Sequence, residues 1–254
     1  MIVLKSEREI KKIKEAGHIV YLALMAAGEA CVPGATTKDV DKAAEDLIIE
    51  HGYNPSCKGY AEGDEVPFPA CCCVSVNDEI IHGIPSDRVL NEGDVVKVDI
   101  VADKDGYFAD AARTFIVGET KDPDALRLIE VTKQSFFEGL KYAKIGNRIS
   151  DISHAIQEHV EKNGYSVLRE FQGHGVGIAM HEDPGVPNFG KPGKGPRLEE
   201  GMVLAIEPMV CQGERYIMES DDGWSIITED GSLGAHYENT IAITKNGPVI
   251  LTNE

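Results

Sequence analysis

The N-terminal stretch of the chain has polar and apolar positions that recur with a helical period. The segment Glu7 to Glu15 is charged with both signs and runs directly into an apolar stretch, Ile19 to Ala27. This pattern predicts one long helix, and the apolar part is too short to cross a bilayer. A signal peptide is the competing interpretation, because small residues follow the apolar part. The mixed charges before it disfavour that interpretation.

A second helical pattern occurs twice, with an offset of 112 residues. Apolar residues recur at helical spacing from Val40 to Ile48, and Gly52 supplies a stop signal for the helix. The offset superimposes five identical pairs: Gly34 on Gly146, Asp39 on Asp151, Ala43 on Ala155, Gly52 on Gly164 and Tyr53 on Tyr165. The sequence therefore predicts the same helix in two copies.

A β-rich segment also recurs, with an offset of 108 residues. The identical pairs are Leu90 with Leu198, Glu92 with Glu200, Gly93 with Gly201 and Val95 with Val203. In each copy a Glu-Gly turn precedes a predicted strand, Asp94 to Ile100 and Met202 to Ile206, and Asp99 is superimposed on Glu207.

Two repeats in the same order along the chain predict an α+β fold with an internal duplication. We interpret residues 1–254 as one domain with halves of approximately 1–122 and 123–254, because Pro123 lies where the two copies meet.

The segment Val95 to Val117 has the pattern of a β-hairpin with a turn at residues 104–106. Asp99 lies between two apolar residues of the first strand. Since successive side chains of a strand point to opposite faces, Asp99 cannot share the face of its neighbours. Asp110 occupies the second strand of the hairpin.

Two further acids are attached to apolar strands, Glu207 in GMVLAIEPM and Glu238 in AHYENTIAIT. Isolated buried carboxylates are costly, and a divalent cation that bridges them offsets the cost. The alternative for any single acid is a salt bridge or a position facing solvent, which is common on strands. Four acids with one pattern favour the metal.

His174 lies in the glycine-rich segment FQGHGVGIAMHEDP, which we interpret as a turn where a neutral imidazole completes the ligand set. Two Asp, one His and two Glu form an oxygen-rich set that suits a carboxylate-bridged pair of cobalt, manganese, iron(II) or zinc ions. Two metals about 3.5 Å apart typically catalyse hydrolysis.

Composition narrows the class of protein. Acidic residues outnumber basic residues by 43 to 25, and the formal charge of −18 argues against binding to nucleic acid phosphates. Three of the six cysteines are consecutive and no CxxC pair exists, so reduced thiols and a cytoplasmic location are expected. A leftover heptad repeat is absent from the sequence, which favours a monomer.

The ordered segments VNDEIIHGIP, VKVDI, FADAARTF, GHGVGIAMHEDP, AIEPM and YENT resemble type I methionine aminopeptidases along essentially the whole chain. The resemblance implies the pita-bread fold, with antiparallel sheets covered by helices, and removal of the initiator methionine from nascent proteins through a metal-bridging hydroxide. It also implies that Asp99 binds one metal, Asp110 and Glu238 bridge both, and His174 and Glu207 bind the other.

The same resemblance implies three roles near the metals. Glu207 is expected to act as general base, His181 to polarise the scissile carbonyl or steady the tetrahedral intermediate, and His82 to contact the substrate backbone. A hydrogen-bonded structural imidazole is the alternative for either histidine.

The resemblance also assigns a methionine pocket. It consists of Cys57, Tyr60, Phe68, Cys73, His82, Met180, His181 and Trp224. Met180 stands where an aromatic residue is common, and its flexible thioether is expected to loosen that wall. The segment 61–67 is longer and more acidic than usual. Neutral drift is the alternative explanation for both departures.

Three other assignments compete with a type I methionine aminopeptidase. Xaa-Pro aminopeptidases share the fold and ligands but generally carry an N-terminal domain, for which the first ~90 residues leave no room. Type II methionine aminopeptidases have an insertion between the last two glutamate ligands, here only 31 positions apart. A non-catalytic binding protein of this fold is the third alternative, which five intact ligands disfavour. Transient contact with the ribosome is expected if the substrate is a nascent chain.

Overall fold

The computed structural model describes residues 1–61 and 66–254. In this part of the chain the helices are α1 (Glu7–Ala30), α2 (Thr37–Glu50), α3 (Pro123–Leu140) and α4 (Ile149–Lys162). The strands are β1 (Asn54–Pro55), β2 (Cys73–Val76), β3 (Glu79–Ile81), β4 (Val95–Lys104), β5 (Tyr107–Ile116), β6 (Ser166–Val167), β7 (Gln172–Gly175), β8 (Glu182–Pro187), β9 (Val203–Ile206), β10 (Met209–Cys211), β11 (Ile217–Glu219), β12 (Ile226–Thr228), β13 (Gly234–His236), β14 (Asn239–Thr244) and β15 (Gly247–Ile250).

The helix α1 contains the apolar stretch that the sequence singled out. Its N-terminus is closed by a capping box, in which the Ser6 hydroxyl accepts from the Glu9 amide and the Glu9 carboxylate accepts from the Ser6 amide. The buried positions from Ile13 to Ala27 follow the helical period. The prediction of one long helix here is confirmed. Among the described residues, no helix has the length and apolar character needed to cross a membrane.

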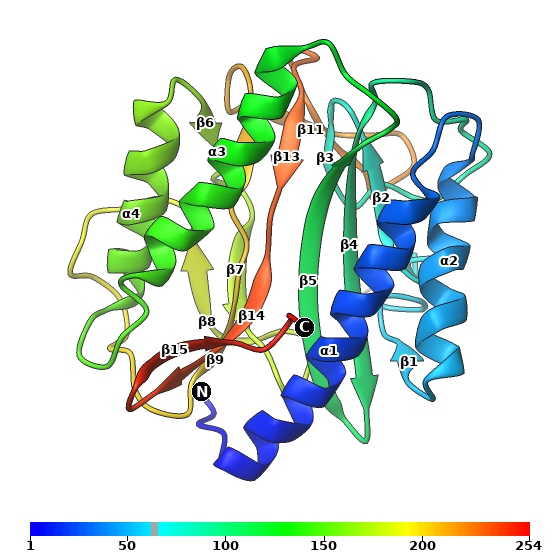
Figure 1. Ribbon diagram of the computed structural model, residues 1–254. Coiled ribbons are helices and arrows are strands. Elements are labelled where there is room, and N and C mark those ends of the chain that lie inside the picture. Colours follow the sequence, from blue (N-terminus) through cyan, green and yellow to red (C-terminus); the bar gives the residue numbers. More distant parts are fainter. Residues whose placement is uncertain (62–65) are drawn as a thin grey trace.

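Two sheets carry most of the strands. In one, β4 pairs with β1, β2 and β5, and in the other the strand order is β15-β14-β9-β7-β8, with antiparallel pairing throughout. Helices α1 and α2 pack beside the first group of strands, α4 packs beside β8 of the second, and α3 packs beside β10 and β13 (Figure 1). This arrangement confirms the predicted α+β class.

The predicted hairpin is formed by β4 and β5, which stay in register from Val95 opposite Ile116 to Lys104 opposite Tyr107. The turn contains only Asp105 and Gly106, with φ values of 55° and 75°. Lys104 was predicted in the turn and instead ends β4. A two-residue turn with both residues left-handed matches the twist of the strands, so pairing extends one residue further.

The internal duplication is confirmed by backbone contacts that repeat with the same offsets. An isolated antiparallel bridge joins Thr36 to Val89, and the corresponding bridge joins Arg148 to Arg197. These partners differ by 112 and 108 residues, as the sequence comparison requires. Each bridge precedes a helix, α2 or α4, whose first turn is closed by an aspartate in a capping box.

The repeated glycines have matching backbone conformations. Gly52 and Gly164, which follow α2 and α4, have φ values of 72° and 85°, and Gly93 and Gly201 have 85° and 91°. A residue with a side chain is strained in this left-handed region, so these four positions require glycine. The duplication therefore extends to the turns that begin and end the repeated elements.

The core consists of two large apolar clusters. One is built mainly from α1, α2, β4 and β5, and the other mainly from α3, α4, β9 and β14. Strand β9 contributes to both clusters, since Ala205 belongs to the first and Leu204 to the second. The interpretation of the chain as one domain with halves of approximately 1–122 and 123–254 stays a prediction.

Candidate active site

The β4–β5 hairpin places two carboxylates on one face. In the register, Asp99 pairs with Ala112 and Val101 pairs with Asp110. Asp99 and Val101 are two positions apart and share a face, so Asp99 and Asp110 are diagonal neighbours on that face. Their strand neighbours Ile100 and Ala111 are fully buried in the core on the other face. This geometry agrees with the prediction from the sequence that the Asp99 side chain points away from the face of its apolar neighbours.

Glu207 and Glu238 approach the same face from the second half of the chain. Glu207 immediately follows β9, and its carbonyl accepts a 2.9 Å hydrogen bond from the Asn188 amide. Glu238 lies between β13 and β14, and its amide donates to the Ala112 carbonyl at 3.0 Å. Backbone contacts with β5 therefore fix the position of Glu238 beside Asp110.

A threonine hydroxyl joins β14, which begins directly after Glu238, to β5, which carries Asp110. The Thr240 hydroxyl of β14 accepts from the Asp110 amide at 2.9 Å and donates to the Asp110 carbonyl at 2.8 Å. The Arg113 guanidinium donates to the Glu238 carbonyl. All these partners are backbone groups of the two acids, so both carboxylates remain available to a ligand.

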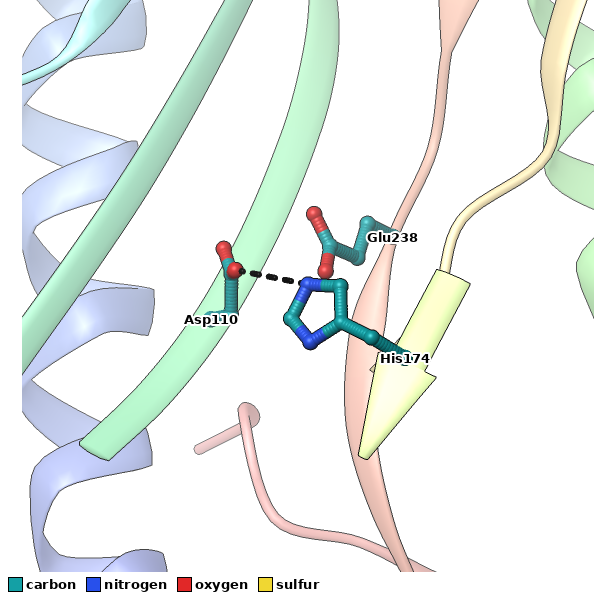
Figure 2. Close-up of side chains that lie close together, drawn as sticks. All are labelled: Asp110, His174 and Glu238. Atoms are coloured by element: carbon teal, nitrogen blue, oxygen red, sulfur yellow. Dashed lines mark ion pairs between the residues drawn. The ribbon is translucent and has the colours of Figure 1, made fainter. Parts of the chain in front are cut away.

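His174 completes the group from β7. Its Nε2 lies 3.6 Å from Asp110 Oδ2 and 3.5 Å from Glu207 Oε1. Figure 2 shows Asp110, His174 and Glu238 converging from three separate segments. Their ligand atoms lie within 4.8 Å of one another.

The prediction that His174 lies in a turn is wrong, since the residue is inside β7. Its two flanking glycines serve close strand packing: a Cβ on Gly173 would lie 2.3 Å from the Ala205 carbonyl oxygen, and one on Gly175 would lie 2.3 Å from the Asp183 carbonyl oxygen. Glycine was correctly taken as a sign of close backbone approach, but the approach is between strands.

The protonation states follow from burial. Burial lowers the pKa of His174 to about 4, so the imidazole is neutral at neutral pH. Its Nδ1 lies 2.9 Å from the Gly175 carbonyl oxygen. A carbonyl only accepts, so Nδ1 carries the proton and Nε2 turns its lone pair toward the carboxylates.

The four acids affect one another. Burial raises the pKa of Asp99 to about 6 and the pKa values of Asp110, Glu207 and Glu238 well above their ordinary value. The Asp99 charge contributes to each of the last three shifts. Four acids that resist ionisation together are the environment that a divalent cation relieves.

Buried carboxylate oxygens that lack hydrogen-bond partners in the described part of the chain are a second observation that fits a divalent metal. Asp99 Oδ1, Asp110 Oδ1 and Glu238 Oε1 are buried and have no hydrogen-bond partner among the described residues. Buried polar atoms without partners are rare and need an explanation, and a cation bound between these oxygens supplies one. Oxygen ligands with one imidazole suit a transition metal such as manganese or iron(II).

A cavity of about 450 Å³ opens beside the carboxylates, and all the residues predicted for the site line it. Its apolar wall contains Cys57, Phe68, Cys73 and Met180, which are buried together, with Tyr60 and Trp224 packed against them. The Trp224 indole donates to the Val66 carbonyl at 2.9 Å. Within the acidic segment 61–67, residues 62–65 lie outside the described residues, and the prediction made for that segment stands untested.

The two other predicted histidines lie at the border between the apolar wall and the carboxylates. The Tyr60 hydroxyl is 2.7 Å from His181 Nδ1, and the rings of His174 and His181 are 4.4 Å apart. His82 follows β3 with a φ of 59° and meets the Phe171 ring edge to face. Burial lowers the pKa of His82 to about 4.

Several cavity residues were missed by sequence reasoning, and His236 is the most polar of them. It is 1% exposed, and its Nε2 lies 3.8 Å from Glu238 Oε2. Neither ring nitrogen has a hydrogen-bond partner among the described residues. The signal was available, because residues two apart in an extended segment share a face. The other missed residues are Ile81, Val101, Phe171, Gln172, Gly173, Glu219, Gly223 and Ile226.

Comparison with known proteins decides the class of this site. Residues 11–245 match metallopeptidase family M24. The chain belongs to this family. An M24 peptidase requires divalent metal, in agreement with the carboxylate group and its unpaired buried oxygens.

Methionine aminopeptidases match this M24 peptidase along essentially their full length, and a prolidase matches it over part of its own length. A methionine aminopeptidase from Clostridium acetobutylicum is 53% identical over 253 residues, which cover 99% of each chain. The crystal structure of a methionine aminopeptidase from Thermotoga maritima has a TM-score of 0.96 and 45% identity, with complete coverage of both chains. A prolidase from Pyrococcus furiosus has a TM-score of 0.77 and 25% identity, and the match covers 99% of this chain but 66% of that one. These neighbours confirm the expected pita-bread fold.

Proposed function

We propose that this M24 peptidase removes the N-terminal methionine from peptides and nascent polypeptides, as a type I methionine aminopeptidase. The observation that supports the proposal most is that one cavity of about 450 Å³ is lined both by an apolar wall and by the carboxylate group. Full-length relatives that carry this activity in their names support the same substrate. We also propose that the protein acts in the cytoplasm as a monomer, with transient contact to the ribosome.

The proposed cofactor is a pair of divalent metal ions held by Asp99, Asp110, His174, Glu207 and Glu238. When bound, such a pair activates water and polarises the scissile carbonyl. The chain contributes a rigid ligand set, because three of the five side chains lie on paired strands, β4 and β5 of one sheet and β7 of another. Cobalt, manganese, iron(II) and zinc all remain candidates for the identity of the metal.

Glu207 is the proposed general base. Burial raises its pKa well above that of an ordinary glutamate, and a carboxylate with a raised pKa is a stronger base. Its carboxylate accepts the proton of the attacking water and returns it to the leaving amine. The position directly after β9, with its carbonyl held by Asn188, limits the movement of the Glu207 backbone.

His181 is proposed to stabilise the developing oxyanion. When the Tyr60 hydroxyl donates to Nδ1, the proton of the neutral ring lies on Nε2, which can donate to the substrate carbonyl oxygen. His82 is proposed to bind the substrate backbone, and its neutral ring can both donate and accept. Cys57, Tyr60, Phe68, Cys73, Met180 and Trp224 form the proposed pocket for the methionine side chain.

The proposal is tested with Met-Ala-Ser and an Ala-Pro peptide, assayed after chelation and after addition of manganese, iron(II) or cobalt. We expect metal-dependent release of methionine, and near-complete loss in Glu207→Gln. The matched control is Glu199→Gln, which changes an exposed acid. Cleavage of only the Ala-Pro peptide would favour an Xaa-Pro aminopeptidase, and no cleavage of either peptide would favour a binding protein.

A further inference from the structure

The loop that carries Met180 and His181 is closed by the residue that follows it. This loop, residues 176–181, joins β7 to β8. The Glu182 carboxylate turns back over the loop, where Oε1 accepts from the Ile178 amide at 2.7 Å and from the Ala179 amide at 3.1 Å. One side chain therefore sets the path of the backbone just before the two cavity residues.

The same carboxylate forms an ion pair with a lysine from the N-terminal segment. Lys5 Nζ donates to Glu182 Oε2, and the two side chains are only 1% and 7% exposed. Lys5 Nζ also donates to the Val3 carbonyl at 3.1 Å. A buried pair is weak evidence for stability, because desolvation opposes the attraction, but it fixes geometry when further hydrogen bonds complete it.

Close packing holds the lysine stem against the loop. Gly177 has a φ of 147°, and a Cβ at this position would lie 2.7 Å from Lys5 Cε. The Lys5 amide donates to the Gly201 carbonyl at 2.7 Å, which anchors the backbone of the N-terminal segment. The Gly177 carbonyl accepts from the Phe108 amide of β5 at 2.7 Å. The loop is thus held from two sides, by β5 and by Lys5.

We infer that Lys5 is a positioning residue for the substrate pocket, acting through Glu182 on the loop that presents Met180 and His181. Lys5 itself does not line the cavity, whereas Met180 and His181 do. Loss of the ammonium leaves the Glu182 charge buried without its partner, and the carboxylate then turns toward solvent and releases the Ile178 and Ala179 amides.

The inference rests on the proposed function, so the assay must separate the two. Lys5→Met keeps the length of the apolar stem and removes the charge. We expect it to raise the KM for Met-Ala-Ser by about tenfold, because a displaced Met180 loses apolar contact with the methionine side chain, and one such contact in a pocket discriminates by about 10- to 200-fold. Lys38→Met is the matched control, since Lys38 forms an exposed pair with Asp87 away from the cavity.

A second measurement does not depend on turnover. Trp224 is the one tryptophan of the sequence and lines the cavity, so its fluorescence reports binding of free methionine to chelated protein. We expect weaker binding in Lys5→Met and unchanged binding in Lys38→Met. If Lys5→Met does not fold, Glu182→Gln, which keeps the shape of the side chain, takes its place in both measurements.

The outcomes are distinct. If wild-type protein releases no methionine, the proposed function fails. If wild-type protein is active and the folded variants keep the wild-type KM and methionine affinity, the positioning role is overturned. A lower kcat with unchanged KM and affinity also overturns it, because a smaller folded fraction alone produces that result. A raised KM together with weaker methionine binding supports the role.

Discussion

Replacing Asp99 with asparagine is expected to stabilise the metal-free protein. Folding raises the pKa of Asp99 from 3.8 to about 6, because burial in the carboxylate group disfavours its charge. A raised pKa means that the folded state holds the proton more tightly than the unfolded state. Its stabilising contribution is therefore complete below pH 3.8 and is lost as the pH rises through about 6. Asparagine does not titrate and avoids this loss.

The size of the effect follows from the same change in pKa. Each tenfold change in proton affinity corresponds to about 1.4 kcal/mol, so the rise from 3.8 to about 6 corresponds to at most about 3 kcal/mol at pH 7.5. For a chain of this size about 1 kcal/mol moves the melting temperature by roughly 2–4 °C. We therefore expect Asp99→Asn to melt above chelated wild-type protein at pH 7.5, by at most roughly 6–12 °C.

The assay is thermal unfolding of chelated protein, followed by circular dichroism at pH 4 and pH 7.5, with and without manganese. Asp105→Asn, at the exposed tip of the same hairpin, is the control. Manganese at 100 times its Kd adds about 2.7 kcal/mol of stability to wild-type protein and much less to the variant. The reasoning fails if chelated Asp99→Asn melts no higher than wild type at pH 7.5, or if the difference is equally large at pH 4.

Three other substitutions test separate parts of the site. Met180→Ala should reduce the preference for methionyl over leucyl peptides, measured as a ratio of kcat/KM, by about tenfold, because pocket contacts discriminate by about 1–3 kcal/mol. An unchanged ratio would place Met180 outside the pocket. Tyr60→Phe removes the hydroxyl beside His181 Nδ1 and should lower kcat/KM for methionyl peptides by about 3–10-fold, whereas unaltered kinetics would separate Tyr60 from catalysis. Arg113→Met removes the largely buried guanidinium that donates to the Glu238 carbonyl, and it should lower the free energy of unfolding, measured in urea, by about 2–4 kcal/mol. A loss under about 1 kcal/mol would contradict the stabilising role of Arg113.

The internal repeat allowed the related helices and strands of the two halves to be predicted from the sequence. Offsets of 112 and 108 residues predicted two related helices and strands, and the Thr36–Val89 and Arg148–Arg197 bridges are the structural form of those offsets. The β4–β5 hairpin was predicted from alternation, and only the position of its turn was off by one residue. Elements with strong periodicity and defined end signals are set by local interactions, so a sequence pattern suffices to find them.

The errors concern positions whose conformation depends on distant partners. His174 looked like a turn residue because glycines flank it, but those glycines admit the carbonyls of Ala205 and Asp183 from neighbouring strands. His236 is an exception, because its position two residues before Glu238 in an extended segment was a local signal that the prediction did not use. Lys5 gave no signal at all, since its partner Glu182 is 177 residues away in the chain. Such contacts exist only once the two halves have packed together.

The duplication also accounts for where the chemistry lies. Asp99 and Glu207 occupy equivalent positions after repeated Glu-Gly turns, and both line the same cavity, so the repeat supplies two of its carboxylates. The second half of the chain also contributes residues that have no counterpart in the repeat. It contributes His174, whose neutral Nε2 faces Asp110 and Glu207, and it contributes the loop held by Glu182. The repeated acids account for two of the four carboxylates that line the cavity, and His174 and the loop of residues 176–181 are additions made by the second half of the chain.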